Sequence, residues 1–336
     1  MAYITLNKNN FFTNLDIIAK RTSSKDKIAI VLKDNAYGHG LEEMASMSYE
    51  YGIKRAVVQT SMEAKQIEKY FDYILVLAQV PTEASKKIRY TINDIKSIDK
   101  FAKDSLVELK VDTGMHRNGI SMDELENGFK KIKEAGLILE AVFTHHRSSD
   151  ELTSEWFWQN ENFKKVKEES INLAKEYGFD KPRFHSANSA SLFRTKECLE
   201  DMVRVGISAY GYLEANFIDI GLKPVLSLYA NKISSRTLSK GKCVGYGAAY
   251  KIKEKTIVSN YDFGYGSGFL RACSNNYKTP NGSELVGRIS MDNSSFISDE
   301  DQLLVFNDVQ VVAKSANSIS YEVLTSLKED IKREIC

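Results

Sequence analysis

A lysine stands at the end of a short apolar run near the start of the chain. Residues 28–32 read IAIVL, Lys33 follows directly, and residues 34–40 form a polar segment with a tyrosine and two glycines. Burial of an unpaired ammonium group costs free energy, so a lysine that leaves a buried strand is a candidate for chemistry. A partly desolvated lysine can lose its proton and form a Schiff base with a cofactor such as pyridoxal phosphate. A surface lysine that opens a βα loop is the alternative.

Four more polar segments follow apolar runs. They are DTGMHRNG (112–119, with Arg117), THHRSSDE (144–151), HSANSAS (185–191) and RVGIS (204–208). Asn188, Ser189, Gly206 and Ile207 offer hydroxyl and backbone N–H donors of the kind that bind a phosphate group. The alternative for Asn188 and Ser189 is an ordinary helix N-cap, and that for Arg204 is a structural salt bridge. Solvation alone does not explain five such segments after five different runs.

The first two thirds of the chain contain eight short runs rich in β-branched residues, with helical patterns between most of them. The helical patterns include residues 41–52, 61–70 and 122–135. Eight strands that alternate with helices over about 200 residues predict a (β/α)₈ TIM-type barrel, whose active site lies at the carboxyl ends of the strands. A doubly wound open sheet is the alternative, but its first turn normally carries a glycine-rich phosphate loop. The eight expected strands are residues 28–32, 55–58, 73–77, 90–92, 107–111, 137–143, 182–185 and 202–207.

From Pro224 onward the pattern changes to alternating segments separated by Gly, Asn, Asp and Ser turns, which predicts a mainly β domain. We therefore expect an α/β chain with a barrel domain at residues 1–222 and a C-terminal mainly β domain at residues 223–336. For the first few residues, pairing with the second domain is the alternative. An amphipathic stretch, residues 321–335, predicts a terminal helix.

Composition excludes several classes of function. The chain has 336 residues and a formal net charge of +1 with interspersed charges, so neither nucleic acid nor an anionic membrane is an expected partner. It has no apolar stretch of membrane-spanning length and no signal-like N-terminus, which predicts a cytoplasmic protein. Cys198, Cys243, Cys273 and Cys336 are widely spaced and lack metal-ligand spacing, so we expect no metal site and no disulfide.

The segment VLKDNAYGHG (31–40) resembles the cofactor-lysine motif of bacterial alanine racemases, with Asp34-Asn35 after the lysine. The resemblance extends over nearly the whole chain. It implies a barrel that binds pyridoxal phosphate, a following β domain, and racemisation of alanine that supplies D-alanine for peptidoglycan. It implies that Tyr37, Ser189, Gly206, Ile207 and Tyr321 hold the phosphate and that His145 lies near the cofactor ring.

The same resemblance places Arg204 on the pyridine nitrogen with His185 behind it. An arginine does not give up its proton at accessible pH and so cannot fully protonate that nitrogen, which disfavours transamination. Racemisation needs bases on both sides of Cα. The resemblance assigns these roles to Lys33 and to Tyr246 of the partner subunit, which implies a homodimer with shared active sites.

The remaining matched positions concern the substrate. The resemblance implies that Arg117 and the Met291 backbone N–H bind the substrate carboxylate, with Asp292 in the same motif and Tyr265 at the substrate entry. Lys110 matches a lysine that is carbamylated in many members. Departures from the family pattern are His116, His146-Arg147, Val205, Gly245, Ser290 and the stretch Tyr265-Gly266-Ser267-Gly268.

Three other functions compete with this interpretation. Decarboxylases of the same barrel family usually place an acidic residue on the pyridine nitrogen, so Arg204 argues against them. Broader-specificity amino-acid racemases are typically exported, and no signal segment is visible. Non-catalytic pyridoxal-phosphate-binding proteins share the barrel but lack the second domain, so residues 224–336 and Tyr246 argue against that class.

Overall fold

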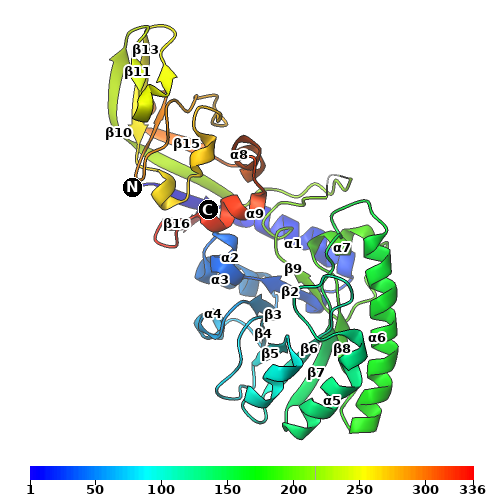
Figure 1. Ribbon diagram of the computed structural model, residues 1–336. Coiled ribbons are helices and arrows are strands. Elements are labelled where there is room, and N and C mark those ends of the chain that lie inside the picture. Colours follow the sequence, from blue (N-terminus) through cyan, green and yellow to red (C-terminus); the bar gives the residue numbers. More distant parts are fainter. Residues whose placement is uncertain (216) are drawn as a thin grey trace.

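A computed structural model describes residues 1–215 and 217–336 (Figure 1). Eight parallel strands pair in the order β8-β7-β6-β5-β4-β3-β2-β9. This arrangement confirms the predicted barrel, because each of the eight expected runs forms one strand of the sheet. The strands are β2 (Ile28–Val31), β3 (Arg55–Val58), β4 (Tyr73–Val76), β5 (Ile88–Ile92), β6 (Leu106–Lys110), β7 (Ile138–Phe143), β8 (Arg183–His185) and β9 (Val203–Val205).

β8 and β9 lie at the two ends of the hydrogen-bonded order, and contacts between their segments nearly close the barrel. Individual hydrogen bonds join the two strands in place of a regular ladder. The Arg204 N–H donates to the Ala187 carbonyl at 3.0 Å, and the Phe184 N–H donates to the Asp201 carboxylate at 2.8 Å. Ala187 and Arg204 belong to segments that the sequence marked as polar, whereas Phe184 and Asp201 do not.

Helices cover the outside of the barrel, and glycines in the left-handed region end some of them. Gly52 (φ 98°) ends α3 and Gly178 (φ 69°) ends α6. The three helical patterns predicted between strands are confirmed, although the last begins as a 3₁₀ turn and residues 77–87 form no helix. The helices are α1 (Lys8–Thr22), α2 (Lys33–Tyr37), α3 (Leu41–Tyr51), α4 (Ser61–Ile67), α5 (Leu125–Glu134), α6 (Glu155–Tyr177) and α7 (Ser189–Arg194), with 3₁₀ turns η1 (Lys25–Lys27), η2 (Ile95–Lys100) and η3 (Met122–Glu124).

The second part of the chain is rich in antiparallel strands, as its alternating pattern predicted. The long strand β10 pairs with β1, β13 and β15, and its far half leaves the core to form the tip seen at the top of Figure 1. β1 comes from the N-terminus and lies between β10 and β16. The elements are β1 (Tyr3–Leu6), β10 (Leu226–Leu238), β11 (Cys243–Val244), β12 (Tyr250–Lys251), β13 (Thr256–Tyr261), β14 (Ser294–Phe296), β15 (Gln302–Phe306), β16 (Lys332–Ile335), α8 (Val309–Ala316) and α9 (Ser320–Ser326), with 3₁₀ turns η4 (Tyr246–Ala248), η5 (Tyr265–Ser267) and η6 (Arg271–Cys273).

The predicted terminal helix over residues 321–335 is wrong in its second half. Helix α9 stops at Ser326, and β16 pairs in parallel with β1. An edge strand gains ladder hydrogen bonds from a neighbour that is distant in sequence, and here that gain outweighs the local helical pattern. The change of direction after α9 allows the Arg333 guanidinium to reach the Gly38 carbonyl, at 2.9 and 3.2 Å.

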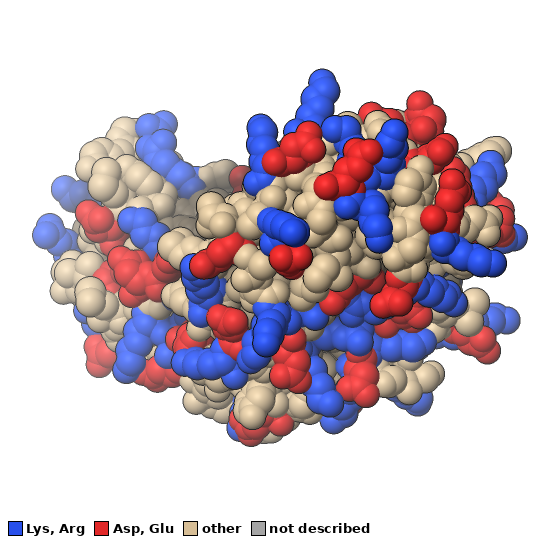
Figure 2. Space-filling model, turned by 90° about the horizontal axis from the view of Figure 1, so that it is seen from below, with Lys and Arg blue, Asp and Glu red and all other residues tan. Residues whose placement is uncertain are grey.

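The surface carries charges of both signs. Figure 2 shows Lys and Arg side chains interspersed with Asp and Glu over the face seen from below. No helix of the described chain is long and apolar enough to cross a membrane.

Candidate active site

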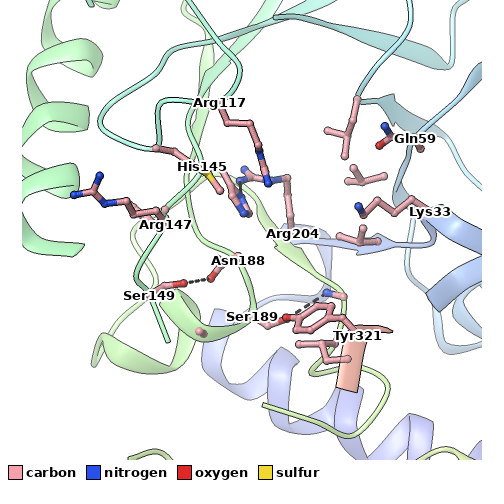
Figure 3. Close-up of a pocket in the computed structure, with 18 of the residues that line it drawn as sticks. Lys33, Gln59, Arg117, His145, Arg147, Ser149, Asn188, Ser189, Arg204 and Tyr321 are labelled. Atoms are coloured by element: carbon pink, nitrogen blue, oxygen red, sulfur yellow. Dashed lines mark hydrogen bonds between the residues drawn. The ribbon is translucent and has the colours of Figure 1, made fainter. Parts of the chain in front are cut away.

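A cavity of about 700 Å³ opens at the carboxyl ends of the barrel strands (Figure 3). Five Lys or Arg side chains and three Asp or Glu side chains line it, so the cavity suits an anionic ligand. Lys33 points into it from one side, and Arg204, Arg117 and His145 face it from the other. Eleven sequence-predicted residues line it: Lys33, Tyr37, Lys110, Arg117, His145, Asn188, Ser189, Arg204, Gly206, Ile207 and Tyr321.

Lys33 begins a strained turn. Residues Asp34, Asn35, Ala36 and Tyr37 all have φ between 51° and 54°, so α2 is a left-handed turn, a conformation that costs free energy for residues with a Cβ. The Glu63 carboxylate accepts the Asp34 N–H at 2.8 Å, and Asn35 accepts the Leu41 N–H at 2.8 Å. The side chain of Lys33 is about one-third exposed, with Nζ 3.3 Å from the Asp34 carboxylate.

Arg204 is buried in the middle of β9, and its two terminal nitrogens are held by the protein. Nη1 donates to His185 Nδ1 at 2.5 Å, and Nη2 donates to the Thr144 and Ser186 carbonyls at 2.8 and 3.2 Å. Nε has no hydrogen-bond partner among the described residues. Burial lowers the pKa of Arg204 to about 10, so the guanidinium stays charged at neutral pH and offers one donor to a ligand.

His185 lies behind Arg204 and does not line the cavity. Its ring is fully buried and stacks on Phe143 at 4.6 Å. Its Nε2 lies 2.8 Å from the Glu108 carboxylate. The sequence analysis did not identify Glu108 as a site residue. A carboxylate within the apolar run of a buried strand, VELKV, is the signal that could have identified Glu108.

The other end of the cavity holds hydroxyl and N–H donors. Ser189 Oγ lies 3.2 Å from the Gly206 nitrogen, and the rings of Tyr37 and Tyr321 are 5.9 Å apart. Burial raises the pKa of both tyrosines, so their hydroxyls remain protonated donors. A Cβ on Gly206 would come within 2.7 Å of the Tyr37 hydroxyl, so only glycine fits there without a shift. Asn188 also caps α7 through the Ser191 N–H at 2.9 Å, so the N-cap alternative applies as well.

Lys110 and His145 sit near Arg204 with shifted proton affinities. Burial, with Arg204 and Arg117 nearby, lowers the pKa of Lys110 to about 8. Burial and the charges of Arg204 and Lys110 hold the pKa of His145 well below its ordinary value. At neutral pH the His145 imidazole is therefore uncharged, and a minor fraction of the Lys110 amines is neutral.

Besides His185, four sequence-predicted residues do not line this cavity: Tyr246, Tyr265, Met291 and Asp292. They lie in the second part of the chain, where Tyr246, Met291 and Tyr265 are 68, 57 and 42% exposed. The Tyr265 N–H donates to the Ser290 carbonyl at 3.0 Å and the Gly266 N–H to the Met291 carbonyl at 2.7 Å. Turn η5 and residues 290–292 therefore form one surface. Turn η4 lies beside Arg288, which is three residues before Met291. A Cβ on Gly245 would lie 3.4 Å from the Arg288 nitrogen, and one on Gly247 would lie 3.2 Å from Arg288 Nη1.

Comparisons with known proteins give the family. The models "Alanine racemase, N-terminal domain" and "Alanine racemase, C-terminal domain" match residues 6–214 and 225–335. The chain belongs to the alanine racemase family. A curated alanine racemase of a Nitratiruptor species is 43% identical over 335 residues, which cover 99% of each chain.

Solved structures agree in fold. An alanine racemase of Clostridium difficile 630 has 25% identity and a TM-score of 0.89, with 100% of this chain and 95% of that chain covered. The alanine racemase of Bartonella henselae, solved with covalently bound pyridoxal phosphate, has 24% identity and a TM-score of 0.86, with coverage of 100 and 99%. The family is dependent on pyridoxal phosphate. Within residues 1–215 and 217–336, no cluster of three or more His, Cys, Asp or Glu side chains could hold a metal ion.

Proposed function

We propose that this chain interconverts L-alanine and D-alanine with pyridoxal 5'-phosphate as its cofactor. The observation that carries the proposal is Lys33, placed two residues after the end of β2 in a cationic cavity opposite Arg204. Membership of the alanine racemase family over nearly the whole chain supports alanine as the substrate.

The residues of the cavity fit this cofactor. Lys33 would bind it covalently, and Arg204 Nε, which lacks a partner among the described residues, would face the pyridine nitrogen. Donors at the other end of the cavity suit the phosphate group, and His145 would lie beside the ring. The proposed phosphate contacts are Tyr37, Asn188, Ser189, Gly206, Ile207 and Tyr321.

When bound, pyridoxal phosphate supplies an electron sink that makes the Cα–H of an attached amino acid acidic. The chain's own task is then to move a proton at Cα. Lys33 Nζ would remove or return it on one side, and the hydroxyl of Tyr246 of the partner subunit would do so on the other. Arg117 and the Met291 backbone N–H would bind the substrate carboxylate, with Tyr265 and Asp292 near the entry.

A homodimer with shared active sites follows from the same proposal. Tyr246, Tyr265 and Met291 form an exposed surface that does not line the cavity of their own chain. Exposed apolar side chains gathered on one surface are typical of interfaces. Twofold pairing would place this surface at the cavity of the other subunit. We further propose a boundary between residues 222 and 223 and a cytoplasmic location.

Chiral chromatography tests this function. Purified protein loaded with pyridoxal phosphate should convert L-alanine to a mixture of both enantiomers, and borohydride should trap the cofactor on Lys33. Lys33→Ala should lose activity by on the order of 10²–10⁴-fold or more. Lys54→Ala, which changes an exposed lysine at the other end of the barrel, is the matched control.

Two outcomes would overturn parts of this proposal. A wild-type protein that binds the cofactor but forms no D-alanine would contradict the racemase function. Racemisation of serine or other amino acids at similar rates would contradict a preference for alanine.

A further inference from the structure

The interior of the barrel contains a carboxylate one layer below the cavity. Glu108 and Lys110 are two residues apart on β6, so their side chains share the inner face of the strand. Glu108 is fully buried. One oxygen, Oε1, accepts hydrogen bonds from the Tyr73 hydroxyl and from Arg183 Nη2, the latter at 3.2 Å. The other, Oε2, faces His185 Nε2 at 2.8 Å.

The polarity of these hydrogen bonds determines where the proton of His185 lies. A guanidinium has only donors, so His185 Nδ1, which faces Arg204 Nη1, must be the acceptor. Burial lowers the pKa of His185 in spite of Glu108, so the ring is neutral at pH 7. Its single proton is therefore on Nε2 and is donated to Glu108 Oε2.

Glu108 is ionised in this arrangement. Burial alone would raise its pKa, but His185, Arg183 and Tyr73 together bring it below its ordinary value. An ionised carboxylate only accepts hydrogen bonds, and it therefore favours the tautomer with Nε2 protonated.

We propose that Glu108 is a positioning residue, which fixes the Nε2–H tautomer of His185 and thereby holds the Arg204 guanidinium in place for the cofactor. This inference rests on the proposed function only in the final step, the contact of Arg204 with the pyridine nitrogen. The arrangement of Glu108, His185 and Arg204 is a property of the chain itself.

Replacement by glutamine makes a sharp test. Tyr73 and Arg183 both donate to the same side of the Glu108 group, so the amide oxygen of glutamine should take that side. The amide NH₂ then faces His185 Nε2 and requires it to accept, which moves the ring proton to Nδ1. Two donors, Nδ1–H and Arg204 Nη1–H, would then face each other, and Arg204 would lose its support.

The experiment is ¹⁵N NMR of the holoenzyme labelled at histidine, with His185 assigned from its loss in His185→Gln. Wild type should show an unprotonated Nδ1 and a protonated Nε2, and Glu108→Gln should show the reverse. Glu140→Gln is the matched control, because Glu140 accepts from the same Arg183 at 2.9 Å but does not contact His185. It should keep the wild-type tautomer.

A second readout is the fraction of turnovers that end in transamination, measured as pyridoxamine phosphate formed per D-alanine formed. Arg204 is proposed to suppress this side reaction, so the fraction should rise several-fold in Glu108→Gln, as in Arg204→Glu, and stay unchanged in Glu140→Gln. A structural role alone would lower yield or stability without moving this ratio.

Three results would overturn the inference: a protonated Nδ1 in wild type, an unchanged tautomer in Glu108→Gln, or an unchanged ratio in that variant. The wild-type spectrum decides the matter even if Glu108→Gln does not fold. Failure of the proposed function would appear differently, as a wild-type protein with the expected tautomer but no D-alanine.

Discussion

Lys110 shows how one residue's surroundings set its chemistry. Its amine is mostly buried and lies near the cationic groups of Arg204 and Arg117, and these surroundings lower its pKa to about 8. At pH 7 roughly a tenth of such amines are neutral, against fewer than about one in a thousand for an ordinary lysine. A neutral amine can react with carbon dioxide, and the carbamate formed would be an anion beside two guanidinium groups.

We therefore predict that Lys110 is carbamylated. Protein equilibrated with ¹³C-bicarbonate should show a carbamate carbon signal, and a crystal structure should show extra density at Nζ. Lys110→Arg should lose the signal, whereas Lys103→Arg should keep it. An unmodified Nζ under these conditions would mean that the local positive charge is balanced in another way.

Sequence reasoning at this scale identified side chains that a motif places at strand ends, such as Lys33, Arg117 and Arg204. It did not identify Glu108, because the role of that residue depends on contacts with Tyr73, Arg183 and His185 from other strands. Nor did it predict the left-handed turn at Asp34 to Tyr37, which is fixed by a hydrogen bond from the Asp34 N–H to Glu63 and by packing on α9.

The elements around Lys33 are held by a close approach between α2 and α9. A Cβ on Gly38 would lie 2.0 Å from the Leu324 carbonyl oxygen, and Gly38 has φ 73°, so both space and conformation require glycine. Gly52 also has a positive φ, 98°, but an added Cβ there meets nothing within 4 Å.

These two glycines make a matched pair of variants. Gly52→Ala should destabilise the protein by about 1 kcal/mol through conformation alone. Gly38→Ala should cost about 2 kcal/mol or more and should also weaken pyridoxal phosphate binding, because α9 carries Tyr321 at the cavity. Chemical unfolding midpoints and cofactor titrations measure the two effects. Equal stability and equal affinity of the two variants would contradict the role of this contact.

Strands were predictable from β-branched runs because each run is buried whatever its partners are. The end of the chain was not predictable in this way. Residues 332–335 form β16 only because β1, at the opposite end of the sequence, offers a free edge. The closure between β8 and β9 likewise depends on Asp201 and Ala187, which lie outside any regular pattern.

At the scale of the whole molecule, buried histidines make stability depend on pH. Burial lowers the pKa of His39 to about 4 and that of His146 to about 3. An unfolded histidine has a pKa near 6.5, so the unfolded chain binds more protons between these values. The stability contributed by each neutral histidine is fully present above about pH 6.5 and is lost as the pH falls toward the folded pKa.

We predict that the free energy of unfolding falls between pH 7.5 and 5.5 by about 1.3 kcal/mol for each such histidine. His39→Gln should reduce this fall by that amount, whatever its effect at pH 7.5. His116→Gln, which changes an exposed histidine, should retain the contribution of His39. Urea unfolding at the two pH values measures it, and an equal fall in wild type and His39→Gln would contradict the assignment.

Racemisation by two bases from two subunits is the central claim, and mixing two inactive variants tests it most directly. Lys33→Ala and Tyr246→Phe homodimers should each be nearly inactive. A heterodimer of the two has one site without either base and one intact site, so random mixing after unfolding and refolding should restore about a quarter of wild-type activity. If heterodimers form, as shown by differently tagged subunits purified together, and the mixture stays as inactive as its parents, the shared-site account is wrong.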